Sequence, residues 1–127
     1  MQLQVTTSQA IQLLQHLHCC SNAVQSGQSI AVAIGLTYQR FVQVATRLRN
    51  DGLLISTSGR YGGYTLGKSA EEISLYDVAL SVQGELHINH CSGKKCEDGN
   101  CKTHRFLQSL QNKMIAEMSN TYIADLA

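Results

Sequence analysis

The sequence predicts a mainly α-helical fold with one small β-hairpin, arranged as a winged helix-turn-helix followed by a long C-terminal helix. Three observations lead to this prediction. A short apolar segment, a glycine-containing turn and a longer amphipathic segment follow one another in residues 29–52, as in a helix-turn-helix. A polar, glycine-rich stretch between two apolar runs predicts a hairpin over residues 53–66. A helical stripe of apolar residues begins near residue 107.

The first expected helix runs from residue 7 to about residue 20. Apolar residues recur there at spacings of three and four, which places them on one face of a helix. Thr7 or Ser8 is the expected N-cap, because a hydroxyl oxygen can accept from the free amides of the first turn. The apolar face consists of Ala10, Leu13, Leu14 and Leu17.

The second helix of the helix-turn-helix is expected between Thr37, a good N-cap, and Gly52, a good C-terminal stop. Its apolar residues, Phe41, Val44, Ala45 and Leu48, repeat at helical spacing and are expected to pack inward. Its outward face is expected to carry side chains that donate hydrogen bonds to bases and phosphates. These are Gln39, Arg40, Gln43, Arg47 and Arg49.

The hairpin over residues 53–66 directly follows this helix, which is the place of a wing. Its tip, Ser58 to Gly63, holds Arg60 between glycines. Glycine lets a backbone approach a phosphate or groove closely, and an arginine can enter a minor groove. An ordinary surface hairpin is the alternative, and the position after a helix-turn-helix favours the wing.

Two further helices are expected. The first begins with a capping box in which Ser74 is the N-cap and Asp77 the third helical residue, and it ends at Gly84. The last helix begins near Thr103. In so short a chain its apolar stripe predicts pairing with a second copy, although packing on its own domain is an equal alternative. The stripe consists of Leu107, Leu110, Met114, Met118 and Tyr122.

The formal net charge is +1, but the charges are unevenly distributed. Residues 1–66 contain four arginines against one aspartate, whereas residues 67–127 contain six basic and eight acidic residues. Arginine suits bidentate contacts with phosphates and base edges. The sequence lacks both an apolar run of membrane-spanning length and a signal peptide, so we expect a cytoplasmic protein. It also lacks a nucleophile–base pattern and a phosphate-binding loop, so we do not expect an enzyme.

Five cysteines in such a chain favour metal or redox chemistry over disulfides. Three of them, with a histidine, form the pattern C-x4-C-x4-C-x2-H. Thiolates select zinc, copper(I) or iron–sulfur clusters, so a structural zinc site, a cluster and a metal-free oxidant sensor all remain open from the spacing. Cys19 and Cys20 are expected to be ordinary thiols. The pattern consists of Cys91, Cys96, Cys101 and His104.

The order of these segments resembles the family of winged-helix regulators that includes the iron–sulfur cluster regulator IscR and the nitric-oxide sensor NsrR. The resemblance covers essentially the whole chain. It is carried by Arg47-Leu48-Arg49 with Gly52-Leu53, by Gly62-Gly63-Tyr64, by Ile73-Ser74-Leu75 and by the three cysteines. It implies a homodimer that binds double-stranded DNA at a pseudo-palindromic operator. It also implies that the last helix is a dimerisation helix.

The same resemblance implies an iron–sulfur cluster on Cys91, Cys96 and Cys101, with His104 as the fourth ligand of the IscR type. No carboxylate stands at Thr7-Ser8-Gln9, where the NsrR type would supply its ligand, so a 2Fe–2S cluster is favoured over a 4Fe–4S cluster. Both loops between the cysteines are one residue shorter than expected for the IscR type. Arg40-Phe41 and Ser58 also depart from the usual pattern, so a base preference cannot be copied from a relative.

We therefore expect a transcription regulator, acting as a repressor, that senses iron–sulfur status, redox state or nitric oxide. One compact unit is expected per chain, with a winged helix-turn-helix in residues 1–66. A connecting helix and cysteine-rich loop occupy residues 67–104, and the dimerisation helix occupies residues 105–127. The expected DNA contacts are Thr37, Gln39, Arg40, Gln43, Arg47, Arg49, Ser58 and Arg60.

Overall fold

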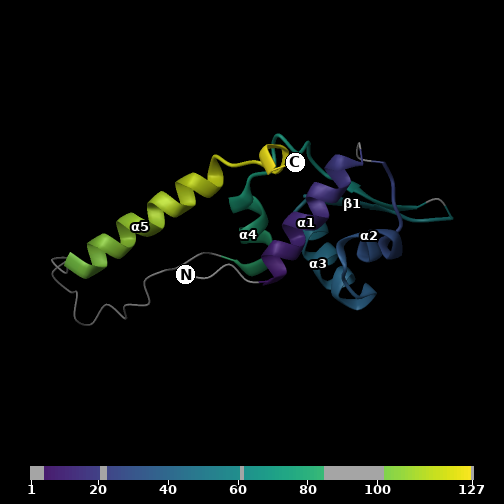
Figure 1. Cartoon of the computed structure of the whole chain (residues 1–127), viewed down its shortest axis with the longest axis horizontal. Coiled ribbons are helices and arrows are strands. Elements are labelled where there is room, and N and C mark those ends of the chain that lie inside the picture. The colour runs from purple at the N-terminus through teal and green to yellow at the C-terminus, as the bar shows by residue number, and fades with distance from the viewer. Residues whose placement is uncertain (1–4, 21–22, 61, 85–101, 127) are drawn as a thin grey trace.

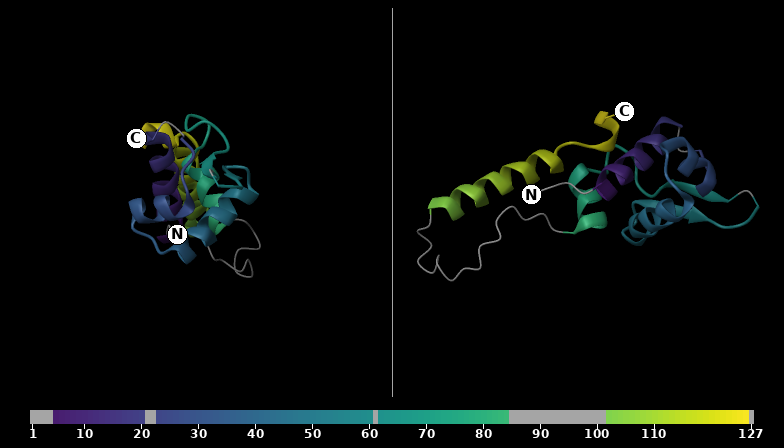
Figure 2. Two further views of the ribbon diagram at one scale, coloured as in Figure 1. Left: turned by 90° about the vertical axis from the view of Figure 1, so that its right-hand side faces the viewer. Right: turned by 60° about the horizontal axis from the view of Figure 1, so that its bottom comes forward.

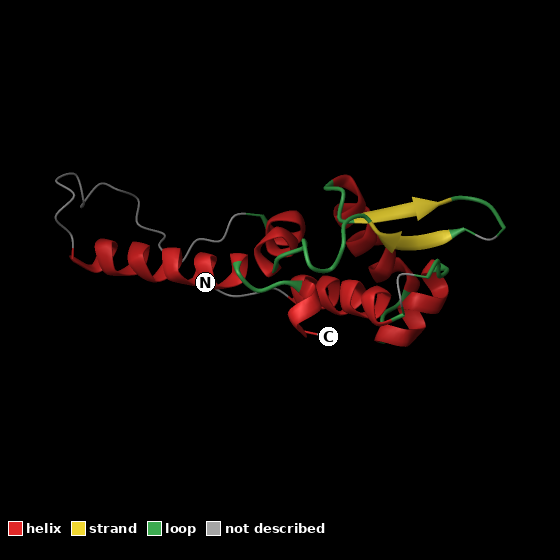
Figure 3. Cartoon of the chain, turned by 90° about the horizontal axis from the view of Figure 1, so that it is seen from above, coloured by secondary structure: helices red, strands yellow, loops and turns green. Residues whose placement is uncertain are grey.

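The computed structural model describes residues 5–20, 23–60, 62–84 and 102–126. These residues form five α-helices, a two-stranded antiparallel sheet and a short 3₁₀ helix, in the order α1, α2, α3, β1, β2, α4, α5, η1. Helices α1 to α4 gather into a body, and the hairpin and α5 project from opposite ends of it (Figures 1 and 3). The predicted fold class is confirmed. Among the described residues, we find no helix long and apolar enough to cross a membrane.

Helix α1 spans Val5–Cys19 and lays its apolar face into the body. The predicted N-cap is wrong, because the helix begins at Val5 and Thr7 lies inside its first turns. Thr7 is fully buried, and its hydroxyl donates to the Gln83 side-chain oxygen at 2.6 Å. A long-range partner therefore satisfies the hydroxyl that we expected to cap the helix locally.

The helix-turn-helix consists of α2 (Gly27–Ile34) and α3 (Tyr38–Asn50). Helix α2 begins at the N-cap Ser26 and ends at Gly35, whose φ of 76° lies in the left-handed region that glycine tolerates. Thr37 is the N-cap of α3, and its hydroxyl oxygen accepts from the backbone amide of Arg40 at 3.2 Å. The predicted boundaries of the second helix are confirmed.

The hairpin pairs β1 (Leu54–Thr57) with β2 (Gly63–Leu66), and Leu54 faces Leu66 in its register. A bridge between Gln25 and Tyr64 joins β2 to the segment before α2. A Cβ at Gly63 would lie 2.1 Å from the Gln25 carbonyl oxygen. The close approach that this glycine allows is therefore to the chain's own backbone.

Helix α4 spans Leu75–Gln83 and carries the predicted capping box. The Ser74 hydroxyl accepts from the Asp77 amide, and the Asp77 carboxylate accepts from the Ser74 amide, both at 3.1 Å. Gly84 is the C-cap, as predicted. Each end of α4 is therefore fixed by residues adjacent in the sequence.

Helix α5 spans Lys102–Ser119, so the predicted stripe extends one turn too far. Tyr122 lies beyond the helix and forms a bridge with Ser74. The 3₁₀ helix η1 (Ile123–Leu126) then packs against α1, which brings the end of the described chain back to the body (Figure 2). Two hydrogen bonds hold η1 against the body: the Ile123 amide donates to the Ile73 carbonyl oxygen, and the Ala124 amide donates to the Ala70 carbonyl oxygen.

One continuous core joins α1 to α4, the hairpin and η1. Phe41 of α3 is fully buried and meets the Tyr64 ring edge-on, with ring centroids 5.2 Å apart. Ile123 is also fully buried in this core. The largest fully buried side chains are Phe41, Leu13, Leu14, Leu17, Ile30, Leu48, Leu54, Ile73, Ile123, Val44, Val78 and Val82.

Candidate nucleic-acid interface

The exposed face of α3 is mostly polar, as its sequence predicts, although Tyr38 and Val42 are also exposed. Thr37, Gln39 and Gln43 are exposed at its start and along this face, and Arg47 and Arg49 are exposed nearer its end. The opposite face is anchored by buried Phe41 and by its apolar neighbours on the same stripe. Because the buried stripe fixes the rotation of the helix about its axis, the polar face is presented outward by the fold itself.

The hairpin adjoins this helix. The Arg49 guanidinium at the end of α3 donates to the Ser56 hydroxyl of β1 at 3.4 Å. The contact between Phe41 and Tyr64 joins the same two elements through the core. Ser58 and Arg60 are exposed in the loop between the strands. Helix α3 and the hairpin are thus held together as one unit.

Arg40 does not lie fully on the outward face, which corrects the sequence-based expectation. It is half-buried, and its guanidinium donates to the Gln9 side-chain oxygen at 2.9 Å and to the Thr6 hydroxyl. A third bond runs to the Gln43 side-chain oxygen at 3.2 Å. The physical reason is that acceptors on α1 meet a donor-rich guanidinium at the first turn of α3.

Arg47 also has partners within the chain. Its guanidinium donates to the carbonyl oxygen of Val82 in the last turn of α4. The Ser81 hydroxyl donates back to the Arg47 carbonyl oxygen at 3.1 Å. Arg47 remains exposed, so these bonds join α3 to α4 while part of the side chain faces solvent.

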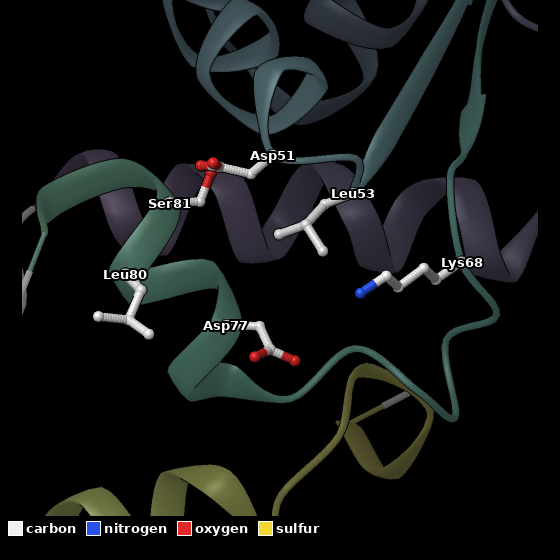
Figure 4. Close-up of a pocket in the computed structure, with 6 residues that line it drawn as sticks. All are labelled: Asp51, Leu53, Lys68, Asp77, Leu80 and Ser81. Atoms are coloured by element: carbon white, nitrogen blue, oxygen red, sulfur yellow. The ribbon is translucent and has the colours of Figure 1, made fainter.

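Two hollows on the body differ in charge. A hollow of about 590 Å³ lies beside α3, and the described residues that line it include two arginines and no acidic residue. A second, of about 190 Å³, lies between α4 and the residues that flank the hairpin, and its lining includes Lys68 together with Asp51 and Asp77 (Figure 4). Of these two, the hollow beside α3 suits a polyanion better, because its described lining carries only positive charge. Its lining consists of Thr6, Arg40, Val42, Gln43, Thr46 and Arg47.

Sequence reasoning missed the α1 and α4 residues that hold the arginines of α3. Thr6 and Gln9 stand 34 and 31 residues from Arg40, and Val82 stands 35 residues from Arg47. No local spacing rule connects residues that far apart. The available signal was the helical spacing of Thr6 and Gln9, which places both on one face of α1.

The structure describes only one residue of the cysteine–histidine pattern. Cys91, Cys96 and Cys101 lie outside the described residues, whereas His104 is half-buried in the first turn of α5. The described ranges contain no group of three or more potential metal ligands. Cys19 and Cys20, which we expected to be ordinary thiols, are free, the first exposed and the second half-buried.

A capped helix-turn-helix followed directly by a hairpin, with a polar helix face outward, defines the chain as a winged helix-turn-helix protein. The chain belongs to the Rrf2 family: the family described as an iron-dependent transcriptional regulator matches residues 3–127. This confirms the resemblance stated from the sequence. The family and the relatives below are named as transcriptional regulators, which agrees with the expectation that the chain is not an enzyme.

Curated relatives carry the name HTH-type transcriptional regulator IscR. The protein from Yersinia pseudotuberculosis is 34% identical over 94 residues, which are 72% of this chain and 57% of the relative. The matched region thus spans little more than half the length of these relatives. A Staphylococcus aureus structure, CymR in an oxidized form, has a TM-score of 0.80 at 26% identity and covers all of this chain and 96% of its own. CymR of B. subtilis, a global cysteine regulator, has a TM-score of 0.82 at 21% identity, with the same coverage, which shows a shared fold.

Proposed function

We propose that this chain is a DNA-binding transcription regulator that acts as a homodimer and carries an iron–sulfur cluster on its cysteine segment. The main support for DNA binding is the exposed polar face of α3, which the buried core holds in place beside the hairpin. Family membership supports the same function. A repressor is the form of regulation that we expect.

In the proposed complex, α3 enters a major groove and the hairpin lies against the neighbouring backbone or minor groove. Gln39 and Gln43 face base edges, because amide side chains can donate to and accept from them. Arg49 and Arg60 supply positive charge for phosphates, and Arg60 can also reach the minor groove. Thr37 and Ser58 add hydroxyl contacts, and Arg47 adds positive charge nearer the end of α3, whereas Arg40 lies half-buried behind this face.

Helix α5 supports the dimer. Gln111 is its one buried residue, whereas Phe106 is 66% exposed and Leu110 is 38% exposed. An apolar face that the described residues leave exposed is suited to a second copy. Two copies related by a two-fold axis would bind a pseudo-palindromic operator, with half-sites about one helical turn apart.

The cluster proposal depends on donor chemistry. The three cysteine thiolates are soft ligands that fit a cluster, the His104 imidazole is a nitrogen ligand that suits iron, and 2Fe–2S is the favoured type. A bound cluster would supply sensitivity to iron, oxidants or nitric oxide. The same four donors also fit a structural zinc ion, so this is the second candidate.

The test of DNA binding is selection of sheared genomic fragments by the purified chain, followed by footprinting of the enriched sequences. We expect enriched sequences with two-fold symmetry and protection of two half-sites. A folded chain that enriches no sequence would contradict the proposal. The variant Gln39→Ala should weaken binding to the enriched site, whereas Lys113→Gln on exposed α5 is the matched control.

The test of the metal site is purification without oxygen, followed by absorption spectroscopy and analysis for iron, sulfide and zinc. We expect a brown protein with equal iron and sulfide, and loss of both in Cys91→Ala and Cys96→Ala. A colourless protein with one zinc per chain would favour the structural zinc site and contradict the cluster. The DNA-binding proposal would survive that result.

A further inference from the structure

The Arg40 guanidinium is occupied within the chain. All three of its nitrogen atoms donate: Nε to Gln9 at 2.9 Å, Nη1 to Gln43 at 3.2 Å, and Nη2 to Thr6. A guanidinium offers its donors in a rigid planar fork, so three simultaneous partners fix its orientation. An Arg40 that reached out to DNA would first have to give up this arrangement.

The partners on α1 are themselves fixed. Thr6 and Gln9 stand three positions apart, so they lie on one face of α1. Between them Thr7 is fully buried and bonded to Gln83 of α4. Arg40 therefore ties the first turn of α3 to a helix that is already locked in the body. A positive charge near a helix N-terminus is unfavourable for the helix dipole, and these bonds offset that cost.

The contact with Gln43 determines what the interface offers to DNA. Arginine has only donors, so the Gln43 atom that faces Arg40 is the amide oxygen. The amide nitrogen of Gln43, which carries two donors, is then directed away from Arg40. Gln43 is exposed on the outward face of α3, so these donors are available to a ligand.

Adenine and guanine present different hydrogen-bonding groups to such a side chain in the major groove. Bidentate recognition of adenine needs both amide atoms, because the oxygen accepts from adenine N6 while the nitrogen donates to N7. Guanine presents two acceptors, O6 and N7, in the major groove. The Gln43 oxygen keeps a second lone pair, but it is turned toward Arg40, so the side chain meets a base with its amide nitrogen first. Such a glutamine suits guanine, which offers two acceptors, better than adenine, which also needs an acceptor for its N6 donor.

We propose that Arg40 is a positioning residue, anchored on α1, that presents Gln43 as a hydrogen-bond donor and so makes it select guanine over adenine. This inference rests on the proposed function, since it concerns how the same α3 surface reads DNA. Arg40 acts through Gln43 and makes no contact with a base or a phosphate.

The experiment is selection from a pool of random-sequence duplex DNA with the full-length wild-type chain, Gln43→Ala and Arg40→Met. Gln43→Ala identifies the base position that Gln43 faces, because preference is lost there. We expect the wild type to favour guanine over adenine about tenfold at this position, a ratio within the usual discrimination of one side chain. Arg40→Met should shift preference toward adenine at the same position, because it releases the Gln43 oxygen.

The salt dependence of binding separates positioning from phosphate contact. Removal of one phosphate contact lowers the slope of log affinity against log salt concentration by about one. Arg40→Met should leave this slope unchanged, whereas the control Arg49→Gln should lower it and leave every base preference intact. The inference would be overturned if Arg40→Met altered the base preference at a different position from Gln43→Ala. It would also be overturned if Arg40→Met lowered the salt slope and left all base preferences unchanged.

The double variant Thr6→Val with Gln9→Ala removes the two α1 acceptors of the Arg40 guanidinium and leaves Arg40 itself in place. We expect a weaker preference for guanine at the Gln43 position, in the same direction as Arg40→Met, because the anchor is lost. An unchanged preference would overturn the anchoring role, and it would do so even if Arg40→Met did not fold. A folded wild-type chain that enriches no sequence would contradict DNA binding itself, which is a different result from either outcome above.

Discussion

The body and helix α5 differ in how fully they bury their apolar side chains. In residues 5–84 the apolar stripes of the helices converge on one core, and Phe41 at its centre is fully buried. In α5, an 18-residue helix, the single buried residue is a glutamine, and Phe106 is 66% exposed. The helices of the body therefore bury their apolar stripes in a shared core, whereas the described residues leave Phe106 and Leu110 of α5 exposed.

Substitutions in the two regions should therefore change different quantities. A residue of the body acts through the free energy of unfolding, because its neighbours are in the same chain. In the dimer that we propose, an exposed apolar residue of α5 acts through association instead. Substitutions of the same residue type in the two regions can test the contrast directly.

The largest expected effect comes from the centre of the body. Phe41→Ala removes a fully buried ring that packs against Tyr64, so the free energy of unfolding should fall by about 3–5 kcal/mol. Urea denaturation followed by circular dichroism measures this loss. A decrease below about 1 kcal/mol would show that Phe41 is not a central core residue.

The returning end of the chain should behave as part of the body. Ile123→Ala removes a fully buried side chain, so the free energy of unfolding should decrease by about 2–4 kcal/mol in the same assay. The neighbouring Leu126→Ala is the control, because Leu126 is 43% exposed and should change stability much less. Equal effects of the two variants would contradict the docking of η1 on the body.

Phe106→Ala is the counterpart of Phe41→Ala in α5. We expect a weaker dimer, by about 2 kcal/mol in association free energy, because exposed aromatic side chains often dominate an interface. Analytical ultracentrifugation over a concentration series measures the monomer–dimer equilibrium. An unchanged equilibrium, with a loss of stability in the monomer instead, would mean that α5 packs only within its own chain.

The smallest effect is expected at the start of α4. Ser74→Ala removes one half of the capping box, and the free energy of unfolding should fall by about 1 kcal/mol. Thermal unfolding measures the shift, with Ser74→Thr as the control that keeps a hydroxyl. If Ser74→Ala and Ser74→Thr lose the same stability, the hydroxyl is not the stabilising group.

The features that the sequence predicted correctly are those set by neighbouring residues. Thr37 and Ser74 cap their helices through bonds that span three residues, and Gly84 ends α4 by a local backbone preference. The features that were wrong depend on distant partners. Thr7 was expected to cap α1, but Gln83 satisfies its hydroxyl across 76 positions. Tyr122 was expected to continue the apolar stripe of α5, but α5 ends at Ser119 and Tyr122 forms a bridge with Ser74.

The candidate site divides in the same way. The outward position of Gln39 and Gln43 follows from helical period, which the sequence contains. The half-buried position of Arg40 follows from Thr6 and Gln9, which only the folded arrangement brings to it. Cluster ligation by Cys91, Cys96 and Cys101 stays a prediction, since these residues lie outside the described part of the chain.

The measurement that tests DNA binding by α3 and the hairpin most directly is a salt titration of affinity for a non-specific duplex. Fluorescence anisotropy at several salt concentrations gives the slope for the wild type, Arg49→Gln and Lys113→Gln. We predict a steep slope that falls by about one in Arg49→Gln, at the end of α3, and stays unchanged in Lys113→Gln, on α5. A wild type that does not bind, or an equal fall in both variants, would contradict this prediction.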